Sequence, residues 1–300
     1  MQTRTDPWVN LLRDTIACFG AAAGGADAIT VLPYDHALGL PTAFSRRVAR
    51  NTQSLLASES NVARVADPAG GSAYVESLTD QLARAARSWF GELDAAGGAT
   101  AGLASGAIAE RLAATRAERD AALATRAQPI TGTSTFPLAG RPCWSAPLVP
   151  SSPARGSPRR RDAEVFEALR ERTAAGDVSI PVPALGAARE HTARLGFVSN
   201  LLGVAGIRPD VVEVTDADAI PAQSGPVAII ASSAKGYAAL AEASVASLRA
   251  AGVERILVAG SAKELGDTTV DAEVRDGMDV VTFLDDLLTT LGAPQAGARA

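Results

Sequence analysis

Histidine and cysteine, the side chains that most often ligate metals or exchange protons near neutral pH, are scarce in this sequence. Only His36, His191, Cys18 and Cys143 occur among its 300 residues, and no two of them stand at the spacing of a metal site. The sequence also lacks a G-x-S-x-G elbow, a Walker loop and a G-x-G-x-x-G motif after a strand. The residues themselves therefore indicate no metal site and no self-evident active site.

Two short stretches leave a functional interpretation open. The sequence Tyr34-Asp35-His36 pairs a carboxylate with an imidazole directly after a predicted strand, where barrel enzymes keep reactive groups. Adjacent side chains point in different directions, however, which favours a polar loop. The stretch from Asp67 to Ser72 contains two glycines and precedes a predicted helix, so its backbone N–H groups could bind a phosphate. A turn that needs the backbone freedom of glycine is the simpler interpretation.

Residues 1–127 alternate predicted helices with short apolar segments. Asp6 and Pro7 form a typical helix start, and Gly24 and Gly25 end that helix. Further helices are predicted at about 41–58, 74–95 and 103–125, and short buried strands at 28–32 and 62–66. This alternation predicts part of an α/β barrel, although so few strands cannot close one.

Residues 128–160 have the composition of a linker. Seven prolines interrupt any helix there, and the segment ends in a basic run that we expect to be solvated. The chain is therefore expected to divide into a domain at 1–127, a proline-rich linker at 128–160 and a second domain at 161–300.

The second domain alternates strands and helices regularly. Strands are predicted at 180–185, 211–214, 227–231, 256–259 and 280–282, and helices at 162–173, 187–205, 235–251, 262–265 and 284–291. Such spacing is typical of right-handed βαβ units in a flavodoxin-like, doubly wound parallel sheet. Ligands of these sheets bind beyond the carboxyl ends of the strands, which here means the loops after Leu185, Ala231 and Ala259.

Composition excludes several classes of protein. Hydrophobic residues make up 47% and charged residues 20%, as in a packed globular chain. The net charge of −5 makes nucleic acid an unexpected partner, and no run of about 20 apolar residues predicts a membrane span. The polar start of the chain does not resemble a signal peptide, and the two cysteines are far apart, so we expect a cytoplasmic protein.

Longer segments resemble the methylmalonyl-CoA mutase family. Residues 6–13, 37–53 and 64–79 are similar to the second half of its acyl-CoA mutase barrel, residues 130–137 to the segment that leaves the barrel, and residues 161–170 to the helix after the linker. The resemblance covers nearly the whole chain. It implies the C-terminal half of a TIM-type barrel, followed by a relative of the family's cobalamin-binding domain.

The cobalamin motifs of that family are altered in this chain. In the binding version, D-x-H-x-x-G supplies a histidine that ligates cobalt, an aspartate that orients it and a glycine that leaves room for the nucleotide tail. Here the three positions are Arg189, His191 and Arg194. The family's S-x-L is Ser232-Ser233-Ala234, and its paired glycines are Ala259-Gly260. His36 stands where catalytic chains carry a glutamate, and the family's substrate-contacting residues belong to the first half of the barrel.

These departures resemble the small, non-catalytic subunits of the family. The resemblance then implies a chain that binds no cofactor and forms a heterodimer with a catalytic chain. That partner holds adenosylcobalamin and interconverts methylmalonyl-CoA and succinyl-CoA. Two alternatives remain open at this point. The chain is a catalytic fragment that binds cobalamin weakly through His191, or it is a truncated gene product without independent function.

Overall fold

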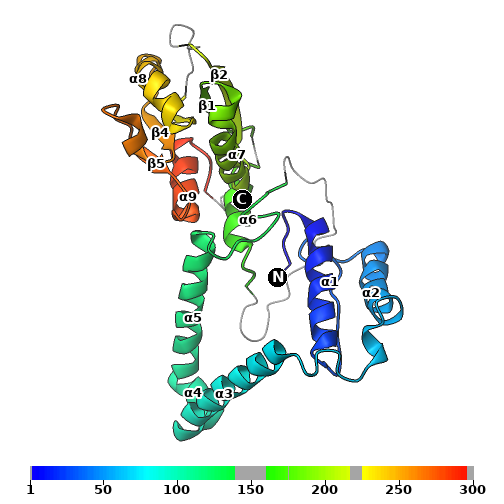
Figure 1. Ribbon diagram of the computed structural model, residues 1–300. Coiled ribbons are helices and arrows are strands. Elements are labelled where there is room, and N and C mark those ends of the chain that lie inside the picture. The colour runs from blue at the N-terminus through cyan, green and yellow to red at the C-terminus, as the bar shows by residue number, and fades with distance from the viewer. Residues whose placement is uncertain (1, 139–159, 175, 217–224, 296–300) are drawn as a thin grey trace. The chain divides into compact units, whose positions relative to one another are not determined.

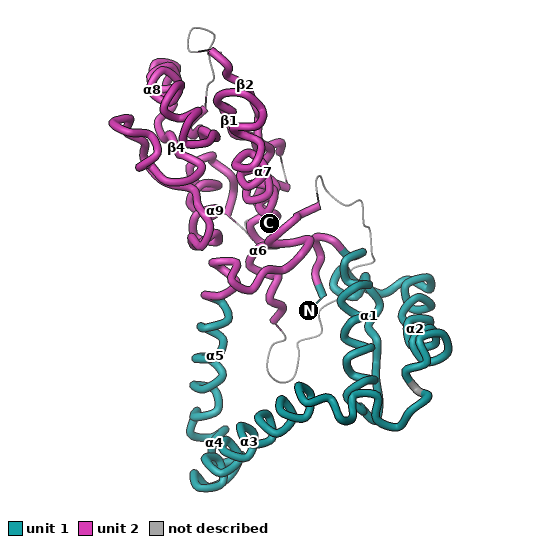
Figure 2. Tube along the Cα trace, viewed as in Figure 1, with its two compact units in different colours: residues 1–2, 7–120, 144–157 teal, residues 3–6, 121–143, 158–300 magenta. Residues whose placement is uncertain are grey.

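The computed structural model of this chain describes residues 2–138, 160–174, 176–216 and 225–295 (Figure 1). Most of the predicted linker, including Cys143 and residues 155–159 of the basic run, lies outside the described residues. The chain forms two compact units (Figure 2). Unit 1 comprises residues 1–2, 7–120 and 144–157, and unit 2 comprises residues 3–6, 121–143 and 158–300.

The N-terminal helices begin and end where local signals predict. They are α1 (Pro7–Ala23), α2 (Ala43–Ser58), α3 (Ala73–Ala95), α4 (Gly98–Ser105) and α5 (Ala107–Ala124). The Thr42 side chain caps α2 by accepting a hydrogen bond from the Ser45 N–H at 3.1 Å. The single helix predicted at 103–125 is two helices, because Gly106 between α4 and α5 adopts a left-handed conformation with φ of 83°.

Neither strand predicted in residues 1–127 is present. Residues 28–32 are not in a strand, and the Ile29 carbonyl accepts a hydrogen bond from the Gln53 side-chain amide at 3.1 Å. Residues Val62–Arg64 form a 3-10 turn after Asn61, which has a left-handed φ of 55°. Within the described part of unit 1 no segment offers these residues a neighbouring strand, and a strand exists only as a member of a ladder.

Large apolar side chains are exposed along the helices of unit 1. On α1, Trp8, Leu12, Ile16 and Phe19 follow one another at helical spacing on one face, and they are 49–71% exposed. The whole of α3 contains no buried residue, although Tyr74, Leu78 and Leu82 form a similar stripe. None of the helices in the described residues is long and apolar enough to cross a membrane.

The described residues of unit 2 contain five parallel strands, as the alternating pattern predicts for an α/β domain. They are β1 (Ser179–Leu185), β2 (Arg208–Val214), β3 (Val227–Ile230), β4 (Arg255–Ala259) and β5 (Ala272–Val274). β1 pairs with β2, and β4 pairs with both β3 and β5. A single bridge between Ala184 and Ala231 joins β1 to β3, so the strand order is β2-β1-β3-β4-β5.

The weak junction between β1 and β3 has a local cause. The Leu185 N–H donates to the Ala231 carbonyl at 3.0 Å, so the alternate residues of β1 direct their nitrogens toward β3. Two of those residues are Pro181 and Pro183, which have no N–H to donate. β1 therefore joins β3 with fewer hydrogen bonds than it shares with β2. The parallel strands of unit 2 confirm the predicted mixed α/β class.

The last part of the predicted pattern in unit 2 is wrong. Residues 280–282 begin the helix α9 (Val280–Thr290) instead of forming a strand, because the Asp279 carboxylate caps this helix by accepting from the Thr282 N–H at 2.9 Å. The fifth strand is the short segment Ala272–Val274, which the hydrophobic pattern did not indicate. The helix predicted at 262–265 is a four-residue 3-10 turn.

Helices cover both faces of this sheet and bury it. Alternate strand residues such as Ile229 and Leu257 pack with α6 (Glu164–Arg172), α7 (Ala188–Val204) and α9. Their neighbours such as Ile230 and Ile256 pack with α8 (Ala234–Ala250) on the other face. Burial on both sides explains why the strands are almost continuously apolar.

A partly exposed ion pair just before β5 in unit 2 generates a prediction about acid stability. The Asp271 carboxylate, just before β5, accepts from the Ile256 N–H and from Arg249 Nη2, both at 2.6 Å. Burial raises the pKa of Asp271, but these hydrogen bonds and the Arg249 charge outweigh it, so the pKa is lowered below 3.8. A lowered carboxyl pKa adds stability above the unfolded value, and this stability is lost as pH falls through the folded value.

We expect Asp271→Asn to lower the stability of unit 2 at pH 7 by about 1 kcal/mol, because the ion pair is partly exposed. The difference in stability between the variant and the parent chain should shrink as pH falls through the lowered pKa of Asp271. Thermal unfolding at pH 7 and near pH 3 measures both effects. Asp267→Asn is the control, since this exposed carboxylate makes no hydrogen bond or ion pair with the described residues. Equal losses at both pH values for Asp271→Asn would contradict the prediction.

Candidate functional site

The loops at the carboxyl ends of β1, β3 and β4 form the candidate site. In a parallel sheet these ends meet at one edge, where ligands of such sheets bind. We call the loops that begin at Gly186, Ala231 and Gly260 the carboxyl edge. The sequence predicts this location, and the structure shows which side chains occupy it.

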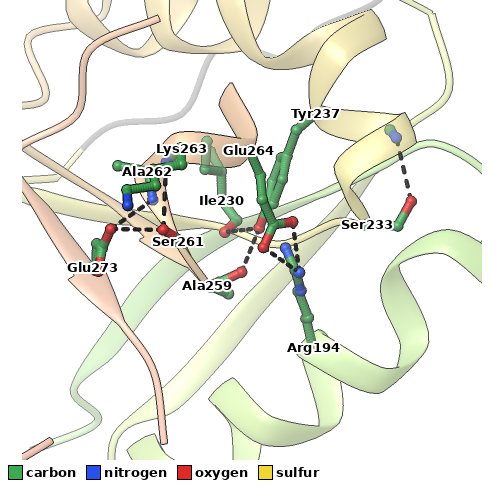
Figure 3. A network of polar contacts seen from close by, with 11 residues as sticks. Arg194, Ile230, Ser233, Tyr237, Ala259, Ser261, Ala262, Lys263, Glu264 and Glu273 are labelled. Carbon is green, nitrogen blue, oxygen red and sulfur yellow. Dashed lines mark hydrogen bonds and ion pairs between the residues drawn. The ribbon is translucent and has the colours of Figure 1, made fainter. Parts of the chain in front are cut away.

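Backbone carbonyls at the carboxyl edge are hydrogen-bonded by side chains of the same chain. Ser232 Oγ donates to the Leu185 carbonyl at 2.6 Å. The Tyr237 hydroxyl, at the start of α8, lies 2.8 Å from the Ala259 carbonyl and 3.2 Å from the Ile230 carbonyl (Figure 3). Burial raises the pKa of Tyr237, which keeps the hydroxyl a proton donor. Ser232 thus satisfies the end of β1, and the single Tyr237 proton is shared between the ends of β3 and β4.

Arg194 extends from α7 into this edge (Figure 3). Its Nη2 atom donates to both carboxylate oxygens of Glu264, at 2.8 and 2.7 Å, and its guanidinium carbon lies 5.3 Å from the centroid of the Tyr237 ring. Burial lowers the pKa of Arg194, but the hydrogen bonds and charges of Glu264 and Tyr237 raise it more, so the net pKa is above the ordinary value. The guanidinium is therefore a permanent cation at the carboxyl edge.

The backbone at Gly260 leaves room for the Arg194 side chain. Gly260 has φ of 120°, and a Cβ atom added to it would lie 2.8 Å from Arg194 Nη1. The 3-10 turn that carries Glu264 is fixed by Glu273, which accepts from the Ala262 N–H at 2.8 Å and from Ser261 Oγ at 3.0 Å. The Ala262 hydrogen bond is the main cause of the lowered pKa of Glu273.

The structure separates the three residues that stand at the altered motif positions. His191 is only 3% exposed, seven residues before Val198 on the same side of α7, and neither ring nitrogen has a hydrogen-bond partner among the described residues. The Arg189 side chain is 78% exposed and lies 3.8 Å from Glu190. Only Arg194 enters the carboxyl edge. Among the described residues no three His, Cys, Asp or Glu side chains gather closely enough to hold a metal ion.

The two stretches left open in unit 1 are turns. Asp35 is buried and its Oδ2 accepts from the Thr42 N–H at 3.2 Å, whereas His36 is exposed, so these side chains do not form an acid–base pair. Ser72 caps α3 by accepting from the Val75 N–H at 3.5 Å, and Gly71 before it has φ of 79°. The glycine turn is therefore the interpretation that the geometry supports.

Sequence reasoning missed two residues of the site, Tyr237 and Glu264. Tyr237 belongs to the first turn of α8, and Glu264 lies 70 residues from Arg194 on a four-residue turn. Neither stands in a recognisable motif. The only available signal was their position after the strands that end at the carboxyl edge.

Comparison with known proteins finds relatives of this chain in one family. The family model described as methylmalonyl-CoA mutase matches residues 1–199. The methylmalonyl-CoA mutase small subunit of Streptomyces virginiae is 48% identical over 97% of this chain and 49% of its own length. The small subunit of Propionibacterium freudenreichii subsp. shermanii is 43% identical over 97% of this chain and 48% of its own length. The chain therefore spans about half the length of these curated relatives.

Steric contact between Gly260 and Arg194 generates a prediction. Gly260→Ala should destabilise unit 2 by about 1–3 kcal/mol, because a φ of 120° is strained for a residue with a Cβ atom and the new methyl group displaces the guanidinium. Gly277→Ala is the control, since Gly277 also has a positive φ, 77°, but no heavy atom within 4 Å of the added Cβ.

A double-mutant cycle separates this contact from backbone strain. In an Arg194→Ala background, Gly260→Ala should cost less than in the parent chain, as measured by chemical denaturation. An equal cost in the two backgrounds would show that Arg194 does not press on this position.

Proposed function

This chain belongs to the methylmalonyl-CoA mutase family, and we propose that it acts as a non-catalytic small subunit. In this role it supports the interconversion of methylmalonyl-CoA and succinyl-CoA, an intramolecular transfer in the isomerase class, by a catalytic partner chain. Its relatives from Streptomyces and Propionibacterium carry the small-subunit name. The chain itself then contributes structure and contact surface, and the partner contributes the chemistry.

One observation supports the non-catalytic role most directly: the carboxyl edge is filled by the chain's own side chains. Arg194 lies over Gly260 and pairs with Glu264, while Ser232 and Tyr237 occupy the carbonyls at the strand ends. Bound adenosylcobalamin would supply radical chemistry through its cobalt–carbon bond. The residues at this edge do not fit it, since His191 has no carboxylate partner and the guanidinium fills the space beside Gly260.

The finer architecture is part of the same proposal. We propose that unit 2 is a flavodoxin-like relative of a cobalamin domain, which the strand order β2-β1-β3-β4-β5 supports. Residues 1–127 are the C-terminal half of a TIM-type barrel, residues 128–160 a linker and residues 161–300 the second domain. The exposed apolar stripe of α1 supports this, because barrel helices pack such stripes against strands.

The proposed partner is a large mutase subunit, which forms a heterodimer with this chain in the cytoplasm. Neither nucleic acid nor membrane enters the proposal. The exposed apolar side chains of α1, Trp8, Leu12, Ile16 and Phe19, offer surface for such a contact.

The altered motif predicts no binding of cobalamin at micromolar concentration. Loss of the carboxylate that orients a ligating histidine typically costs about 10- to 100-fold in metal affinity, and the Arg194 side chain adds steric exclusion. Titration of adenosylcobalamin followed by its visible absorbance measures this. Arg189→Asp combined with Arg194→Gly should restore weak binding at most, because Ala234 and Ala259 also depart from the family pattern.

His191→Ala serves as the matched control in that titration. If the unmodified chain bound cobalamin tightly and His191→Ala abolished binding, the catalytic-fragment interpretation would replace the one proposed here. Unchanged spectra for both chains agree with the proposal.

The function itself is tested by copurification and turnover. The chain alone, supplied with adenosylcobalamin and methylmalonyl-CoA, should form no succinyl-CoA. Coexpressed with a catalytic large subunit, it should copurify and increase the yield of soluble, active mutase over that of the large subunit expressed alone. Turnover by the isolated chain, or failure to copurify, would refute the proposal.

A further inference from the structure

Three loops at the carboxyl edge are connected through the side chain of Arg194 (Figure 3). The residue itself belongs to α7, which follows β1. Its guanidinium reaches the Tyr237 ring on α8, which follows β3, and Glu264 on the 3-10 turn that follows β4. One side chain thus contacts the segments after all three central strands.

The contacts of this arginine are stronger than those of an ordinary surface ion pair. The side chains of Arg194 and Glu264 are only 28% and 26% exposed, and both carboxylate oxygens accept from the guanidinium. Charged hydrogen bonds in such partly dry surroundings are strong, and removing one partner leaves the other charge desolvated. By contrast, the Arg208 and Asp177 side chains of another pair in unit 2 are 55% and 74% exposed.

The backbone at the carboxyl edge leaves room for the Arg194 guanidinium because position 260 has no side chain. Gly260 offers the guanidinium a surface without a side chain, and the Tyr237 hydroxyl ties the same aromatic ring to the ends of β3 and β4. A planar cation therefore lies between an aromatic face, a carboxylate and a bare peptide. These are the groups that a binding site for a guanidinium compound would supply.

We propose that the Arg194 side chain is a built-in ligand of the carboxyl edge. It holds the segments after β1, β3 and β4 in one closed arrangement, as a bound molecule does in a ligand-binding sheet. Its removal leaves a site for a small planar cation, lined by Tyr237, Gly260 and Glu264. This inference stands on the geometry of unit 2 alone and is independent of the proposed function.

Hydrogen exchange of the full chain tests the proposal. Arg194→Ala should raise amide exchange about tenfold in all three segments, residues 187–195, 232–237 and 260–266, because each loses a shared contact. Millimolar methylguanidinium should restore protection in Arg194→Ala and leave the parent chain unchanged. Arg208→Ala, which removes an exposed pair in the same unit, is the matched control and should alter none of these segments.

A second variant keeps the test decisive if Arg194→Ala unfolds. Glu264→Gln retains the guanidinium but removes its charged partner, so it should loosen the same three segments by a smaller factor, without rescue by methylguanidinium. The proposal is overturned if exchange rises only next to the substituted residue. It is also overturned if methylguanidinium fails to restore protection in folded Arg194→Ala, or if Arg208→Ala loosens the same segments.

Discussion

The structure of unit 2 depends on the requirement that a parallel sheet be covered on both faces. Ile229 and Ile230 are neighbours in β3, yet one packs with α6, α7 and α9 and the other with α8. The helices of this unit therefore lie where they bury one or the other face of the strands. The same requirement brings the ends of β1, β3 and β4 to one edge, where the loops of helices from both faces meet.

That edge is where a ligand-binding sheet and this chain differ. Exposed carbonyls, an open glycine and helix starts ordinarily make it a binding surface. Here Ser232 and Tyr237 hydrogen-bond the carbonyls, and Arg194 covers the glycine. The permanent charge of an arginine requires a partner once it is partly buried, and Glu264 provides one. Several side chains thus close the carboxyl edge together, and Arg194 is only one of them.

Unit 1 differs from unit 2 in how few of its apolar side chains are buried. Its helices have caps and regular spacing, but α3 has no buried residue and the apolar stripe of α1 is largely exposed. Isolated helices gain most of their stability from packing of such stripes. The helices of unit 1 are therefore formed by local signals, and several of their apolar side chains remain exposed.

Local chemistry in the sequence determined the helix boundaries at Pro7 and Ser58, four of the five strands of unit 2 and the location of the candidate edge. These features follow from the periodicity of apolar residues and from caps, which act within a few residues. Only the tertiary structure decided whether residues 28–32 form a strand, because a strand needs a neighbour that the segment itself does not contain. The direction of Arg194 likewise depends on Glu264, 70 residues away, and on the ring of Tyr237. A long charged side chain takes its direction from the partners that the folded chain places within its reach, and no local pattern specifies those partners.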